Sequence, residues 1–167
     1  MNNSKKGPLH GIKVLDWTMW QFGPVSTMMM ADLGAEVIKI ESLDGDHGRQ
    51  FGQVSGVASN AYDGVSSHYF EVLNRQKLGI AINLKEKRGQ EIIHSLIKHS
   101  DVFVQNFRQG VAERLGLGWE DLKKINPQLI YGNPGTLEQL RRAGFRTFPE
   151  IFDESYDTII DNEKRAK

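Results

Sequence analysis

The fold class is decided by Ile12-Lys13-Val14-Leu15-Asp16 together with Glu36-Val37-Ile38-Lys39-Ile40, two short segments with the character of buried strands. Gly23-Pro24 turns the chain between them. Val25 to Leu33 predicts a short helix, because Pro24 fits a first helical turn, where its missing N–H would be unbonded anyway. Gly34 fits just past the end of that helix, where a positive φ is often needed. These residues predict a β-α-β unit, and such units cross over right-handedly into a parallel sheet.

The same alternation of apolar and amphipathic segments continues along the chain. We expect further strands at 79–84, 101–105 and 129–131, a helix at 87–99, and short helices at 111–115 and 119–125. Residues 42–67 are rich in Gly, Ser, Asp and Asn without a steady period, which predicts a long loop. The pattern favours an α/β fold, with a mostly parallel sheet and helices on both faces.

The tail of the chain has a different character. Thr136 and Gln139 predict the start of a helix, which is expected to stop at Gly144. The residues after it are aromatic and acidic and then charged, and they lack the alternation of strands and helices. We therefore expect an α/β domain at 8–135 and a separate helical and acidic tail at 136–167.

The composition excludes several classes of function. Lys plus Arg and Asp plus Glu both count 21, and the resulting net charge of zero argues against a nucleic-acid-binding surface. The chain has no cysteine, which excludes a disulfide framework and a thiolate metal site, and its 5 histidines lack metal-ligand spacing. No apolar run approaches the roughly 18 residues of a membrane span. We expect a cytoplasmic protein without a metal, a membrane or a nucleic-acid partner.

Polar or kinked segments follow three of the predicted strands, at the edge where ligands of open parallel sheets bind. They begin at Asp16, Glu41 and Gln105. Taken alone, such residues are better explained by turn chemistry, because Gly, Pro and Asn end strands everywhere. Neither a dinucleotide-binding G-x-G-x-x-G nor a phosphate-binding loop with Gly-Lys-Ser or Gly-Lys-Thr is present.

Basic residues beside predicted strands and helices are a second candidate feature. Arg75 and Lys77 precede a strand, while Arg108 and Arg114 flank the start of a helix. Such positions can hold phosphate through charge and free helix N–H groups. The alternative is that these side chains simply solvate the surface.

Several segments carry a family resemblance, in this order along the chain: 8–16, Gly23-Pro24, 31–41, Leu73-Asn74-Arg75-Gln76-Lys77, 101–108, 114–118 and 125–131. Over about residues 8–135 the chain resembles the amino-terminal part of class III coenzyme A transferases. Relatives of that family include formyl-CoA and carnitine CoA-transferases and α-methylacyl-CoA racemase. Spaced motifs in the correct order are far more specific than any one motif alone.

The resemblance implies an enzyme that handles acyl-CoA thioesters, with a Rossmann-like domain and ring-shaped subunits that interlock as a dimer. In such an enzyme an aspartate attacks the thioester and forms an acyl-aspartyl anhydride. Positions that match the family imply contacts with the thioester end for Gln21 and Phe22. They imply contacts with the rest of the coenzyme for Asn74, Arg75, Lys77, Asn106, Phe107 and Arg114.

The chain also departs from the family pattern. Ser42 stands where some members have an arginine, which weakens one phosphate contact. The catalytic aspartate is not identifiable, because Asp153 and Asp157 lie in a tail that does not resemble the family. The later regions of the family are absent, so we expect a truncated form that binds coenzyme A, with a homodimer or a partner chain supplying the missing regions.

Two alternatives to a working transferase stay open at this point. One is a non-catalytic module that binds coenzyme A for sensing or assembly. The other is a remnant that folds without any ligand. The identity of the acyl group does not follow from these residues, because the family's acyl-side residues lie largely outside the matching part.

Overall fold

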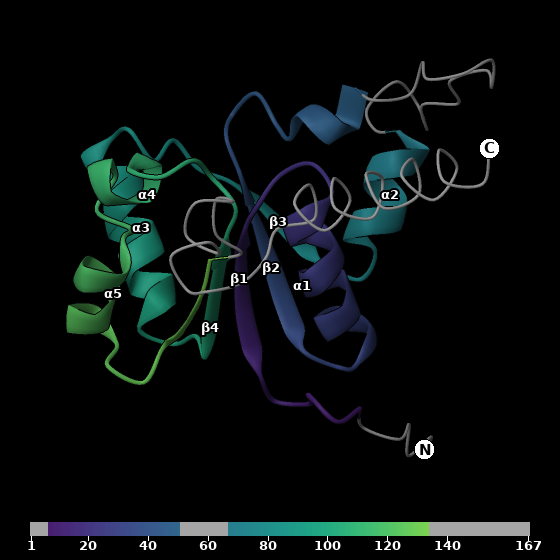
Figure 1. Cartoon of the computed structure of the whole chain (residues 1–167), viewed down its shortest axis with the longest axis horizontal. Helices are drawn as coiled ribbons and strands as arrows, with labels where there is room; N and C mark the ends of the chain where they lie inside the picture. Colours follow the sequence, from purple (N-terminus) through teal and green to yellow (C-terminus); the bar gives the residue numbers. More distant parts are fainter. Residues whose placement is uncertain (1–6, 51–66, 134–167) are drawn as a thin grey trace, which may run out of the picture. The chain divides into compact units, whose positions relative to one another are not determined.

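The computed structural model of the chain describes residues 7–50 and 67–133. Their centre is an all-parallel sheet of five strands in the order β3-β2-β1-β4-β5 (Figure 1). The strands are β1 (Lys13–Trp17), β2 (Glu36–Glu41), β3 (Leu78–Ala81), β4 (Val102–Gln105) and β5 (Ile130–Gly132). The order is that of doubly wound nucleotide-binding sheets, and the predicted α/β fold is confirmed.

Each face of the sheet is covered by its own group of helices. On one face, Leu15 and Phe103 pack in a buried cluster with residues of α3 (Lys87–Ile97), α4 (Val111–Arg114) and α5 (Trp119–Ile125). On the other face, Val14 and Val37 pack against α1 (Phe22–Asp32). A further helix, α2 (His68–Asn74), lies beside α1 (Figure 1). The expectation of helices on both faces is therefore confirmed.

Helix α1 begins three residues earlier than the predicted range of 25–33, at Phe22, and ends at Asp32. Pro24 still lies in the first turn, where its missing N–H costs no hydrogen bond. The turn after the helix is tight, because Gly34 has a φ of 97° and lies against the backbone of Gly7. The β-α-β unit formed by β1, α1 and β2 is thus built as the sequence predicts.

Helix α2 and the end of strand β3 differ from expectation. Helix α2 was not predicted; Ser67 caps it by accepting a hydrogen bond from the Phe70 amide at 3.1 Å. Strand β3 ends at Ala81, although the pattern predicts a strand to residue 84. The chain leaves the sheet there because Asn83 accepts a hydrogen bond from the Lys85 amide at 3.1 Å and turns toward α3. Residues 82–84 therefore lie beyond the carboxyl end of β3.

The remaining expectations fall partly outside the described residues. The long loop after β2 is described as far as residue 50 and contains a short 3₁₀ helix, η1 (His47–Gln50). The predicted helix at 136–143 and the rest of the tail lie outside the described ranges. None of the helices within 7–50 and 67–133 is long and apolar enough to cross a membrane.

We predict that Gly34→Ala lowers the free energy of unfolding by about 1–3 kcal/mol, because an alanine at this positive φ is strained. An added Cβ would also lie 3.1 Å from the Cα of Gly7. Gly79→Ala is the control, since no heavy atom lies within 4 Å of a Cβ built there. Urea unfolding measures both; equal stability of the two variants would contradict the assignment of this turn.

Candidate functional site

The sheet reverses its direction of winding between β1 and β4. The chain passes from β1 to β2 and β3 on one side and then returns to place β4 and β5 on the other side of β1. The loops that leave β1 and β4 consequently diverge at their carboxyl ends. In open α/β sheets this topological switch point is where ligands bind.

The loop after β1 is fixed by a side chain from the end of β4. The Asn106 side-chain oxygen accepts a hydrogen bond from the Met19 amide at 2.9 Å, and its nitrogen donates to the Met19 carbonyl at 2.7 Å. The next residue, Trp20, has a φ of 67°, a conformation that is uncommon for bulky side chains. Such strain persists only where neighbouring contacts impose it. The Trp20 ring stacks near His47 of η1, with centroids 5.9 Å apart.

A buried ion pair lies directly beneath this loop. One oxygen of Asp16 accepts hydrogen bonds from the amide and hydroxyl of Thr18. The other accepts from the Thr27 hydroxyl at 2.7 Å and from Lys77 Nζ at 2.8 Å. Lys77 Nζ also donates to the Pro24 carbonyl at 3.0 Å and to Asn74 at 2.9 Å. Because both oxygens of the carboxylate are engaged and buried, Asp16 is not available as a nucleophile.

The pKa of Lys77 is lowered by this environment. Burial disfavours its charged form, and the nearby charge of Asp16 opposes that effect without reversing it. Both side chains of the pair are at most 1 % exposed. Since the ammonium has three N–H donors and each has an acceptor, Lys77 connects β1, α1 and α2 from inside the fold.

A second buried lysine fixes the loop after β2. Lys39 Nζ donates to the Thr18 carbonyl at 2.8 Å and lies 2.9 Å from Asp46. Glu41 accepts two hydrogen bonds from the Arg49 guanidinium, both at 2.7 Å. Burial raises the pKa of Glu41, but the bonds from Arg49 and from the Asp46 amide outweigh it, so the pKa is lower than usual. The ion pairs Lys39–Asp46 and Arg49–Glu41 therefore fix the loop from Glu41 to Arg49.

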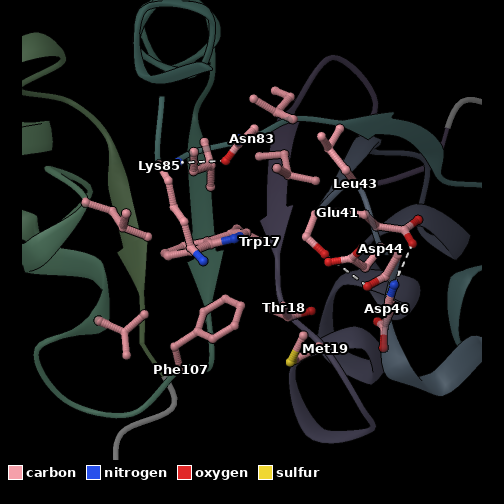
Figure 2. Close-up of a pocket in the computed structure, with 17 residues that line it drawn as sticks. Trp17, Thr18, Met19, Glu41, Leu43, Asp44, Asp46, Asn83, Lys85 and Phe107 are labelled. Atoms are coloured by element: carbon pink, nitrogen blue, oxygen red, sulfur yellow. Dashed lines mark hydrogen bonds between the residues drawn. The ribbon is translucent and has the colours of Figure 1, made fainter. Parts of the chain in front are cut away.

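A cavity of about 430 Å³ opens beyond the carboxyl ends of β1, β2 and β3, on the side of α4 (Figure 2). Apolar residues form much of its lining; they include Trp17, Ile40, Ile82, Leu84 and Phe107. The rings of Trp17 and Phe107 are in contact, with centroids 4.2 Å apart. Figure 2 shows Glu41, Asp44 and Asp46 on one side of the cavity and Lys85, Trp17 and Phe107 on the other.

A second hollow of about 700 Å³ lies on the opposite face of the sheet, between α1 and the strands β4 and β5. Gln21 and Asn133 line it near the carboxyl edge, and most of its other lining side chains are apolar. Phe22 is 71 % exposed there. The described residues thus leave part of the α1 face of the sheet uncovered.

The residues expected at a coenzyme site are distributed over several places. Phe107 lines the cavity, and Gln21 and Phe22 line the hollow beside α1. Lys77, Asn74 and Asn106 make the internal hydrogen bonds described above and line neither space. The last two expected residues, Arg75 and Arg114, are exposed; Arg75 pairs with Asp32.

Sequence reasoning missed the residues that enter the cavity from β3. Asn83 and Lys85 line it because β3 ends at Ala81. The predicted strand at 79–84 hid this carboxyl end. The turn signal Asn83, two residues before a lysine that precedes a helix, was the available clue.

Among residues 7–50 and 67–133 there is no group of three or more His, Asp or Glu side chains that could hold a metal ion. The fold and this edge define a doubly wound α/β protein with a cavity beyond the carboxyl ends of its strands. The comparisons with known proteins identify the family within that class.

The family model of CoA-transferase family III matches residues 9–137. The chain therefore belongs to this family. It is 44 % identical over 131 residues to an acyl-CoA transferase of Fusarium pseudograminearum, covering 77 % of this chain and 29 % of that protein. It is 43 % identical over 125 residues to the formyl-CoA:oxalate CoA-transferase of Streptomyces coelicolor, covering 75 % and 29 %.

The fold agrees with solved structures of this family. The structure of a CAIB/BAIF family protein from Brucella suis matches with a TM-score of 0.69 and 34 % identity, covering 80 % of this chain and 36 % of that one. The chain spans about 30 % of the length of the curated relatives it matches, so it corresponds to a part of the family's fold.

We predict that Lys77→Met lowers the free energy of unfolding by about 3–5 kcal/mol, because the change leaves the Asp16 carboxylate buried without its partner. Lys124→Met is the matched control, since that side chain is 71 % exposed, and it should change stability by less than about 1 kcal/mol. Denaturant unfolding followed by circular dichroism compares the two. A loss below about 1 kcal/mol in Lys77→Met would show that the pair does not hold this edge together.

Proposed function

We propose that this chain binds coenzyme A or its acyl thioesters at the carboxyl edge of its sheet, as part of the machinery that transfers CoA between carboxylic acids. The single observation that carries the proposal is an apolar cavity with one lysine at the switch point of the sheet, in a chain of CoA-transferase family III. Doubly wound sheets bind nucleotides at such a position.

The cavity has the chemistry that an adenine nucleotide requires. The Trp17 and Phe107 rings and the side chains of Ile82 and Leu84 offer apolar and aromatic surface for a flat base. The Lys85 ammonium is a point charge suited to a phosphate group. The loop from Glu41 to Asp46 closes the other side.

The pantetheine arm has a route from this cavity toward the hollow beside α1. Met19 lines the cavity and Gln21, two residues later, lines the hollow. The Asn106–Met19 hydrogen bonds fix the backbone between them. An arm that follows this loop would bring the thioester near Gln21 and Phe22, in agreement with the roles that the family resemblance implies for these residues.

The other expected residues take different roles in this proposal. Asn74 and Lys77 act as positioning residues, because they hold β1 and α1 through Asp16. Asn106 positions the Met19 loop. Arg75 is engaged with Asp32, and Arg114 stands on α4, the helix whose Val111 lines the cavity.

Transfer by an acyl-aspartyl anhydride needs a carboxylate against the thioester carbonyl and donors for the developing oxyanion. Asp16 is fully engaged, and among the described carboxylates that line the cavity Glu41 and Asp46 are held in ion pairs while Asp44 is exposed. We propose that a second copy or a partner chain completes the enzyme. A non-catalytic coenzyme-binding module is the alternative, and the cytoplasmic location expected from the sequence stays a prediction.

We predict that CoA binds the purified chain and that Lys85→Ala weakens binding about tenfold, because a charge-assisted contact to phosphate is lost. Arg114→Ala tests the position that the resemblance adds and is expected to weaken binding by about 1–3 kcal/mol. Lys98→Ala, at the end of α3 and on the opposite edge of the sheet, is the matched control. Isothermal titration calorimetry measures all three; absence of CoA binding in the unchanged chain would sink the proposed function.

We also predict that the isolated chain forms no acyl-enzyme. After incubation with an acyl-CoA, hydroxylamine would convert an aspartyl anhydride into a hydroxamate. Mass spectrometry of the digested chain should find no such adduct, because no described carboxylate has the required setting. An adduct mapped to Asp44, Asp153 or Asp157 would show that the chain is catalytically complete and identify its nucleophile. CoA binding without an adduct supports a subunit or module that needs a partner.

A further inference from the structure

The described lining of the cavity carries more negative than positive charge. Its charged members are three carboxylates and one ammonium, those of Glu41, Asp44, Asp46 and Lys85, and their formal charges sum to −2. Figure 2 shows the three carboxylates together on one side of the cavity. Coenzyme A is itself an anion because of its phosphate groups. Like charges would therefore oppose its entry unless this acidic side is neutralised.

Two cations neutralise the acidic side from behind, although neither belongs to the cavity lining. Lys39 Nζ lies 2.9 Å from Asp46. The Arg49 guanidinium donates to both oxygens of Glu41, each time at 2.7 Å. Each ion pair offsets one negative charge, so the lining together with these two cations has a formal charge of zero.

The two cations differ in how deeply they are buried. The side chains of Lys39 and Asp46 are both 2 % exposed, so replacing Lys39 would leave a carboxylate buried without its partner. The Arg49 side chain is 30 % exposed. Its Cζ lies 3.8 Å from the centroid of the Phe70 ring on α2, a cation–π contact that supports the guanidinium. Arg49 is therefore the cation whose charge can be removed in a folded chain.

Glu41 keeps its negative charge even without Arg49. Burial raises the pKa of Glu41, but the hydrogen bonds from Arg49 and from the Asp46 amide, with the charges of Arg49 and Lys39, lower it below its usual value. The contributions of Asp46 and Lys39 do not depend on Arg49. At about pH 8, well above the usual pKa range of a carboxyl group, a chain without Arg49 therefore presents an additional anion to the cavity.

We propose that Arg49 is the counter-ion that allows the cavity to accept an anionic ligand, because it neutralises Glu41 from outside the lining. The inference rests on the proposed function, and it names a residue that neither the family resemblance nor the lining of the cavity supplies. Arg49 acts through Glu41 without touching the ligand, so it is a positioning residue. The ligand needs no particular orientation, since an unscreened charge acts on phosphates within a Debye length, about 10 Å at 0.1 M salt.

Calorimetric titration of the full chain with CoA at low salt and about pH 8 tests this inference, after circular dichroism has shown that each variant is folded. Arg49→Met should weaken binding about tenfold, because the Glu41 carboxylate then repels the phosphates. Lys98→Met removes the same charge at the opposite edge of the sheet and should change binding by less than about twofold. Equal dissociation constants for Arg49→Met and the unchanged chain would overturn the inference and leave the proposed function standing. Failure of the unchanged chain to bind CoA would overturn both.

Glu41→Gln separates the role of charge from support of the loop, and it does not depend on the folding of Arg49→Met. Glutamine keeps an acceptor for the Asp46 amide, which donates to Glu41 at 2.9 Å. The change leaves Arg49 as a cation beside the cavity, so CoA binding should become about threefold tighter or more. Weaker binding would mean that the pair only holds the loop, and it would contradict the proposal.

The double variant Glu41→Gln/Arg49→Met removes both charges and should bind CoA within about threefold of the unchanged chain. A tenfold loss that persists in the double variant would show that Arg49 does not act through the charge of Glu41. Raising the salt from about 0.05 M to about 0.5 M should also reduce the difference between Arg49→Met and the unchanged chain, because salt screens the repulsion. A loss that is independent of salt would likewise reject a counter-ion role.

Discussion

The buried pair of Asp16 and Lys77 is the constraint on which the carboxyl edge of this sheet depends. It joins the central strand to α1 through Thr27 and Pro24, and to the end of α2 through Asn74. A charge removed from water in this way is costly unless its hydrogen bonds are complete, and here they are complete on both partners. These bonds consequently fix β1, α1 and α2 relative to one another. The loop that leaves β1 therefore begins from a fixed position.

Lys39 extends the same principle to the neighbouring strand. Its ammonium bridges the Thr18 carbonyl and Asp46, so the loops after β1 and β2 share a buried cation. Asp16 and Lys39 thus lie on the α1 face of the sheet with Val14 and Val37, while Leu15 and Ile40 of the same strands pack in the apolar cluster on the opposite face. The largely apolar cavity lies at the same edge, and Asp46, the partner of Lys39, contributes to its lining.

The strands of the sheet can be predicted from the sequence more readily than the residues of the candidate site. The β-α-β unit and the later strands follow from local patterns of apolar residues, together with Pro24 and Gly34, and these are encoded within a few residues. The functions of Asn106 and Lys77 depend on partners 87 and 61 residues away, which no local pattern contains. Lys85 was not predicted to line a cavity, because the strand before it was predicted to extend to residue 84 and in fact ends at Ala81. Helix α2 was not predicted, because it has only seven residues. The family resemblance supplied Gln21, Phe22 and Phe107, but it did not supply the other apolar residues that line the cavity, such as Ile82 and Leu84.

The position of β1 has a consequence for how the chain assembles. This strand pairs with β2, which is close in sequence, and also with β4, whose Val102 lies beside Val14. Pairing across so long a separation carries a large loss of chain entropy, so β1, β2 and α1 are able to form as a local unit before β4 docks. Until that docking, the inner edge of β1 presents unpaired N–H and C=O groups to other chains. A chain in that state is therefore open to strand exchange at the very strand that later forms the centre of the sheet.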